Sequence, residues 1–162
     1  RDGRLALQQQ KRKLGPERGY AYFDTLMDDE LTDMFHHTLF PNVTLTGTYD
    51  GLHFFRTEPD PKDPEWCTFD YWYMVPRIAG KTEVPTIYGM RPYEECEHET
   101  TDYASGTAEL GIGDFLTQDL DVAVAQQNGF HSMGYEDSYL SGQETRIRRF
   151  HEVLNDYIEG RR

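Results

Sequence analysis

The sequence is poor in cysteine, in basic residues and in long apolar runs, and each shortage excludes a class of protein. Its 162 residues include two cysteines, Cys67 and Cys96, which are too few for a disulfide scaffold and favour a reducing, cytoplasmic location. The net charge of −13 argues against nucleic acid and anionic membrane surfaces as partners. No apolar stretch approaches the roughly 20 residues that a membrane-spanning helix needs, and no secretory signal peptide opens the chain.

Several common catalytic motifs are absent as well. The sequence contains no GxGxxG, no Walker loop, no GxSxG elbow, no HExxH and no CxxC. The six histidines form neither a helical i, i+4 pair nor a strand i, i+2 pair. His36 and His37 are adjacent, so on a strand they point to opposite faces and one strand cannot offer both to a single ion. His98 lies among glutamates, in a pattern more typical of a solvated acidic loop than of a metal site.

The spacing of the apolar residues changes along the chain, from every second residue to a helical spacing. Alternation of apolar and polar side chains predicts strands near 37–47, 52–58 and 66–76, joined by short connections and therefore antiparallel. After residue 112 the period becomes helical, which predicts an α+β domain. The predicted segments are a helical N-terminal part (1–35), the antiparallel strands (36–76), a long loop (77–112) and two helices (113–160).

The two predicted C-terminal helices have recognisable ends. The first spans about 114–128, with Gly129 placed to end it in a left-handed conformation. The second, near 142–158, opens with Ser141-Gly-Gln-Glu144, the pattern of a capping box, and Gly160 follows its end. Its apolar stripe recurs every three or four residues and consists of Ile147, Phe150, Leu154 and Ile158.

Asp119 is the most informative single residue of the first of these helices. Its neighbours at three and four positions along the helix are apolar: Phe115, Leu116, Val122 and Ala123. A carboxylate within an apolar stripe must be hydrogen-bonded, bound to a cation or protonated, because an unpaired buried charge costs several kcal/mol. The spacing favours a buried structural carboxylate and a metal ligand equally. Asp121, beside Thr117 and Gln118, is expected on a wetter face.

A series of short motifs runs along the chain in a specific order. The motifs are His36-His-Thr-Leu-Phe-Pro-Asn42, Asp50-Gly-Leu-His-Phe-Phe-Arg56, Phe69-Asp-Tyr-Trp72, Gln118-Asp-Leu-Asp121, Gln127-Asn-Gly129, His131-Ser-Met-Gly134, Leu140-Ser-Gly-Gln-Glu144 and Arg148-Arg-Phe-His151. Each motif is modest alone, but their order and spacing are specific. Through them the sequence, from about Lys11 to Ile158, resembles the catalytic domain of the Rieske-type ring-hydroxylating oxygenase α-subunits.

The resemblance implies a fold and a chemistry. It implies a helix-grip fold of the START/Bet v1-like type, an antiparallel sheet wrapped around a long C-terminal helix, incomplete in this stretch. It also implies hydroxylation of an aromatic or similarly apolar substrate with O2, at a mononuclear Fe(II) held by two histidines and one carboxylate. Asp119 matches the carboxylate ligand, and Met34, His36, Phe115 and Leu116 fall where the family lines its substrate pocket.

Other expectations concern partners. A Rieske [2Fe–2S] cluster supplies electrons in the family, in turn reduced by a ferredoxin or a reductase. The complete protein is expected to be a homo-oligomer, a trimer.

The cluster motif Cys-x-His…Cys-x-x-His and the segment Asp-x-x-His-x-x-x-x-His that provides both iron histidines are absent here. The chain is therefore expected to be the C-terminal portion of an α-subunit, inactive alone and prone to self-association. The alternative is a helix-grip module that binds a small molecule without metal.

Overall fold

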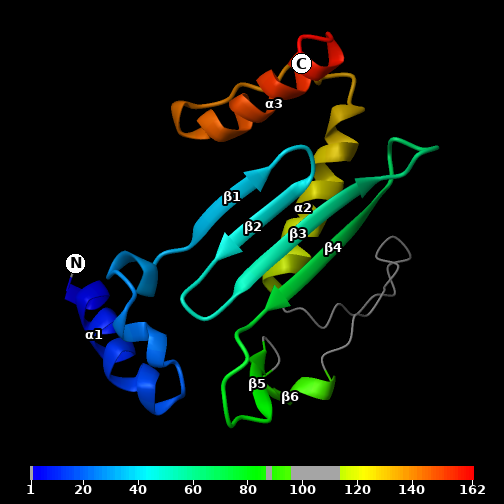
Figure 1. Ribbon diagram of the computed structural model, residues 1–162. Coiled ribbons are helices and arrows are strands. Elements are labelled where there is room, and N and C mark those ends of the chain that lie inside the picture. The colour runs from blue at the N-terminus through cyan, green and yellow to red at the C-terminus, as the bar shows by residue number, and fades with distance from the viewer. Residues whose placement is uncertain (1, 87–88, 96–113) are drawn as a thin grey trace.

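The computed structural model shows a four-stranded sheet with helical segments at both ends of the chain (Figure 1). It describes residues 2–86, 89–95 and 114–162. In order, the regular elements are α1 (Asp2–Glu17), η1 (Ala21–Asp24), η2 (Asp29–Leu31), β1 (Phe35–Leu39), β2 (Val43–Gly47), β3 (Leu52–Pro59), β4 (Cys67–Met74), β5 (Glu83–Thr86), β6 (Gly89–Pro92), η3 (Tyr93–Glu95), α2 (Asp114–Phe130), η5 (Gly142–Glu144) and α3 (Thr145–Ile158).

The sheet is an antiparallel meander in the order β1-β2-β3-β4. The antiparallel pairing confirms the prediction, but the single strand expected over 37–47 is wrong, because the chain turns back at Pro41 and forms β1 and β2. Apolar and hydroxyl side chains alternate on both sides of the turn, in Thr38-Leu39 and in Val43-Thr44-Leu45-Thr46, so the alternation by itself is compatible with one long strand. Proline has no N–H for the ladder, and this is the signal that marks the break.

The strand register sorts the side chains onto two different faces. One face, here called the histidine face, carries a row of directly paired residues across all four strands: His36, Thr46, His53 and Tyr73. Since successive side chains of a strand alternate, Thr44, Phe55 and Tyr71 lie in the next row of this face. The opposite face carries aliphatic and aromatic residues together with Arg56 and Asp70.

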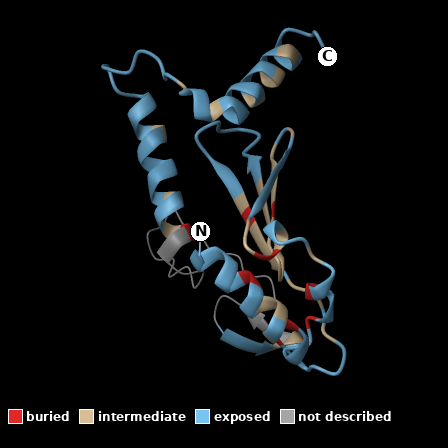
Figure 2. Ribbon diagram, turned by 90° about the vertical axis from the view of Figure 1, so that its left-hand side faces the viewer, coloured by how far each residue is buried: buried red, intermediate tan, exposed pale blue. Residues whose placement is uncertain are grey.

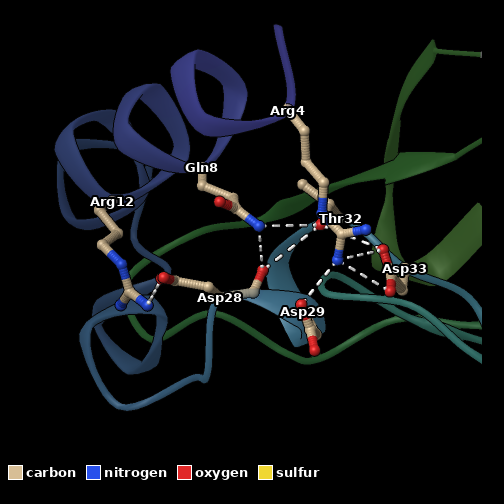
Figure 3. A network of polar contacts seen from close by, with 7 residues as sticks. All are labelled: Arg4, Gln8, Arg12, Asp28, Asp29, Thr32 and Asp33. Atoms are coloured by element: carbon tan, nitrogen blue, oxygen red, sulfur yellow. Dashed lines mark hydrogen bonds and ion pairs between the residues drawn. The ribbon is translucent and has the colours of Figure 1, made fainter. Parts of the chain in front are cut away.

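The N-terminal segment folds into a small unit of its own. α1 packs beside η1 and η2, and the buried side chains Tyr20, Phe23 and Leu31 form the core between them. Polar contacts hold the outside of this core (Figure 3). Arg12 donates to the carbonyl of Leu26 at 2.8 Å and to the carboxylate of Asp28 at 2.7 Å. The segment 1–35, expected to be helical, contains one helix and two short 3-10 turns, and β1 begins at its last residue.

The segment predicted as a loop contains regular structure. β5 and β6 form an antiparallel hairpin that pairs apart from the main sheet. Val84 is almost fully buried, which explains why this short strand is ordered despite its polar neighbours. The loop prediction is therefore wrong over residues 83–86 and 89–92. Its part over 96–112 lies outside the described residues, as do Cys96 and His98.

The C-terminal helices follow their predicted bounds closely. The Ser141 N–H donates to the Glu144 carboxylate at 2.6 Å, which confirms the capping box and lowers the pKa of Glu144. Gly160 has φ 67° just after α3, as expected of a helix-ending glycine. The prediction for Gly129 is wrong: α2 continues through it to Phe130. Figures 1 and 2 show α2 running alongside the sheet and α3 crossing one end of it.

Burial is uneven across these elements (Figure 2). Among the described residues, five hydrophobic side chains are buried, whereas nineteen large ones are exposed. The predicted α+β class is confirmed, with an antiparallel sheet and a C-terminal helix. The described chain nevertheless concentrates its tight packing near the N-terminus and leaves much apolar surface of the C-terminal helices open.

Candidate functional site

The histidine face joins imidazole rings to hydroxyl groups. His36 Nδ1 and Thr46 Oγ1 share a hydrogen bond of 2.7 Å between the paired strands β1 and β2. His53 Nδ1 and the Tyr71 hydroxyl share another, at 2.8 Å, between β3 and β4. Each ring nitrogen donates or accepts according to its tautomer. Both histidines are thus held in fixed orientations by side chains on neighbouring strands.

Aromatic rings surround His53. Its ring stacks on Tyr71 with centroids 5.9 Å apart and lies 4.6 Å from the Tyr73 ring. Burial lowers the pKa of His53, which favours the neutral imidazole. Burial also raises the pKa of the Tyr73 hydroxyl, as does the nearby Asp50 carboxylate to a smaller extent. This row therefore offers neutral hydrogen-bonding groups within an aromatic wall, the usual composition of a small-molecule site.

The opposite face has a structural ion pair. Arg56 donates to one oxygen of Asp70 through Nε at 2.9 Å and through Nη2 at 2.7 Å. The Asp70 side chain is largely buried, and its bond raises the pKa of the Arg56 guanidinium. Arg56 also lies over the Trp72 ring, 5.5 Å from its centroid. Because both charges are satisfied by one another, this pair fixes the register of β3 and β4 and leaves the histidine face as the chemically open one.

The residues predicted for the substrate pocket fall in two places. Met34 precedes β1 and is 62% exposed, and His36 follows it on the histidine face. Leu116 lies in the first turn of α2 and is buried. Phe115 lies beside it in the same turn, with a side chain outside the described part of the structure. The structure therefore places two of these residues at the start of β1 and two in the first turn of α2.

Asp119 occupies the middle of α2 and its side chain is exposed. The apolar stripe around it is not packed as expected, since Val122 is 55% exposed. Asp121 is exposed as well, so the expected contrast in burial between the two carboxylates is absent. Asp119 would be buried only if another part of the protein packed over this face of α2. Its role as a ligand remains a prediction.

A complete metal site is not assembled by the residues that the structure describes. Among residues 2–86, 89–95 and 114–162, no three His, Cys, Asp or Glu side chains are grouped so that they could hold a metal ion. His36 and His37 point to opposite faces of β1, as their adjacency predicts. Neither a facial triad of two histidines and one carboxylate nor the ligand set of a Rieske cluster is therefore assembled among the described residues.

One contact ties α2 to the sheet. Glu65, in the loop between β3 and β4, accepts hydrogen bonds from Gln127 at 2.9 Å and pairs with His131 Nε2 at 2.8 Å. The hydrogen bond from Gln127 and, to a smaller extent, the one with His131 lower the pKa of the Glu65 carboxyl. Sequence reasoning placed Gln127 and His131 in family motifs but gave no partner for them, since their partner lies more than 60 positions away.

A cavity of about 480 Å³ lies between the histidine face and α3. Its walls are the phenyl rings of Phe55, Phe69 and Phe150, with Ile147 beside them. The side chains of Thr38, Thr44 and Thr57 supply the polar part of the sheet wall. Sequence analysis missed this cavity because its two walls are about 90 positions apart. The apolar stripe of α3 was the signal that some surface had to face it.

Comparisons with known proteins agree with these features. Residues 1–160 match the family model of the ring hydroxylating alpha subunit (catalytic domain). Searches of curated proteins and of solved structures found no match. Because the family model covers almost the whole chain, the protein belongs to the ring-hydroxylating α-subunit family, in its catalytic domain. Among the described residues, no helix is both long and apolar enough to cross a membrane.

Proposed function

We propose that this chain is the substrate-pocket and iron-ligand portion of an oxygenase that hydroxylates an aromatic or similarly apolar substrate with O2. The observation that carries the proposal is the family match over residues 1–160. The aromatic wall of the histidine face supports it, because flat apolar molecules stack on such rings while imidazole and hydroxyl groups orient them.

In this proposal Asp119 is the carboxylate ligand of a mononuclear Fe(II). Its place on α2 leaves its oxygens exposed and available to a cation. The two histidine ligands, the Rieske cluster and the ferredoxin or reductase that feeds it would come from other parts of the complete α-subunit and from its partners. This stretch alone would then lack iron, and the complete protein would be a homotrimer.

The four pocket residues have separate roles in the proposal. His36, held by Thr46 at 2.7 Å, would orient a polar edge of the substrate. Met34 and Leu116 would supply adaptable apolar contacts from β1 and α2, together with Phe115. A substrate between the sheet and α2 would cover the exposed Met34 side chain, which is otherwise unfavourably hydrated.

The test is a pair of isosteric variants in the complete α-subunit, Asp119→Asn and Asp121→Asn. Both carboxylates are exposed on the same helix, two residues apart, so the pair controls for charge and for surface polarity. We expect Asp119→Asn to lose bound iron, measured by elemental analysis, and to lose product formation. Asp121→Asn should keep both. The visible absorbance of the Rieske cluster reports that each variant has folded.

Two results would contradict the proposal. If Asp121→Asn loses the iron while Asp119→Asn retains it, the ligand is misassigned by two residues. If both variants retain iron and turnover, the carboxylate ligand lies elsewhere and α2 does not carry the metal.

A further inference from the structure

The cavity between the histidine face and α3 has one charged residue in its lining. Eleven residues line it; ten are apolar or neutral, and the remaining one is Arg146, on the first turn of α3. No carboxylate is among them. In a chain of net charge −13, an anion in this cavity would meet no like charge among the lining residues.

Arg146 differs from the other arginines of this helix. Arg149 pairs with Glu152 at 3.1 Å, and Arg148 lies 3.8 Å from the same carboxylate. Within the part of the chain that the structure describes, Arg146 has no ion pair, and its side chain is exposed. The neighbouring Glu144 carboxylate accepts from the Ser141 N–H at 2.6 Å. Arg146 thus stands at the rim of the cavity with an open guanidinium.

The rest of the cavity suits a flat ring. Phe55 and Phe69 belong to the sheet wall and Phe150 to α3, so aromatic surfaces come from both sides. Phe150 is itself held against Phe40, with ring centroids 5.5 Å apart, which fixes α3 over this end of the sheet. The volume of about 480 Å³ lies within the range of small-molecule sites. An arginine at the rim of an aromatic cavity recognises a planar carboxylate by paired hydrogen bonds.

We infer that this cavity binds an aromatic carboxylate, with its ring between the phenylalanines and its carboxylate on Arg146. The cavity adjoins the aromatic wall of the proposed substrate site, since its lining residue Phe55 stacks on Tyr71 with ring centroids 5.1 Å apart. It is a different site, because Asp119, Met34, His36 and Leu116 do not line it. Binding there needs no iron and no oxygenase chemistry, so this inference stands or fails independently of the proposed function.

The experiment measures binding of two matched probes, 2-naphthoate and the neutral 2-naphthamide, to the chain by titration calorimetry. We expect the carboxylate to bind at least about tenfold more tightly than the amide, since a hydrogen bond between charged groups contributes that much. Arg146→Gln should remove this preference by weakening 2-naphthoate about tenfold while leaving 2-naphthamide unchanged. Arg149→Gln, on the same helix but outside the cavity lining, should retain the wild-type preference.

A ratio of two affinities within one variant is insensitive to partial unfolding, which weakens both probes alike. Ile147→Ala serves as the second variant, because shortening a lining side chain should weaken both probes and leave their ratio intact. Equal affinity of the two probes for the wild-type chain would overturn the inference. So would an unchanged ratio in Arg146→Gln, or an absence of binding at millimolar concentrations of either probe.

Discussion

The two ends of this chain differ in how far their side chains are buried and in where their contacts come from. Between residues 2 and 33, short-range polar contacts and a dense core act together: Leu31 is fully buried, and Gln8 donates to the Asp28 carbonyl at 2.8 Å. Between residues 114 and 158, the helices are amphipathic but open, with Val124 52% and Ile158 73% exposed. The N-terminal unit takes most of its polar contacts from within 30 residues, and Tyr49 and Ile78 pack against its core from later in the chain. In contrast, α2 and α3 present apolar surfaces that local sequence does not cover.

This contrast has a physical reason. Contacts between residues close in sequence cost little loop-closure entropy, so a unit such as α1 with η1 and η2 completes itself. Glu65, more than 60 positions away, joins the loop between β3 and β4 to Gln127 of α2 and to His131 just after it, and Val122 and Val124 of α2 are more than half exposed. Stability should therefore be unequally distributed, high near Leu31 and low along α2. Three experiments test this difference in stability, and they follow in decreasing order of expected effect.

The largest effect is expected from Leu31→Ala. Its side chain is fully buried in the core with Tyr20 and Phe23, so the substitution removes packed apolar contacts and leaves a cavity. The free energy of unfolding should fall by about 3 kcal/mol. Ile158→Ala, at the exposed end of α3, should change it by less than about 0.5 kcal/mol. Urea denaturation followed by circular dichroism measures the free energy of unfolding of both variants. Equal decreases in the two variants would contradict the proposed difference in stability between the two ends of the chain.

A pair of glycines gives the next test. A Cβ on Gly15 of α1 would lie 2.4 Å from the Phe23 ring, so Gly15→Ala should destabilise the fold by about 1–3 kcal/mol through overpacking. A Cβ on Gly129, inside α2, meets nothing within 4 Å. Gly129→Ala should therefore stabilise by about 0.5–1 kcal/mol, as alanine does in an open helix. The comparison fails if the two changes have the same sign in thermal denaturation.

The smallest effect is a dependence on pH at the contact between α2 and the sheet. The pKa of Glu65 is lowered by Gln127 and His131, so its contribution is fully present above the unfolded-state pKa and lost as pH falls through the lower folded-state pKa. Trp66, beside Glu65, reports the contact by its fluorescence. We expect a fluorescence change between about pH 5 and pH 3 that is missing in Glu65→Ala.

Two controls accompany the titration. A Trp72→Phe background leaves Trp66 as the only tryptophan, because the chain has two. Lys62→Ala, in the same loop and exposed, should titrate like the parent protein. A titration that is identical in Glu65→Ala would show that this carboxylate does not hold α2 to the sheet.

Much of the fold could be predicted because it follows from patterns among residues close together in the sequence. The alternation around Val43, Leu52 and Phe69 gave the antiparallel strands, and the Ser141–Glu144 box gave the start of the last helix. The errors were local ambiguities as well. Pro41 divided one expected strand into two, the β5–β6 hairpin stood in a segment interpreted as loop, and Gly129 stayed helical. Pro41 is itself the local signal for the first break, whereas β5 depends on its pairing with β6.

For the candidate site, the ordered motifs were enough to identify the family. The helical position of Asp119 and the strand position of His36 follow from periodicities of 3.6 and two residues, which depend on backbone geometry alone. Three further features depend on how the chain folds in space: His53 meets Tyr71, Gln127 meets Glu65, and α3 lies over an aromatic cavity with Arg146 at its rim. Those pairings join residues far apart in the chain, and strand register and helix packing, which no local pattern encodes, bring them together.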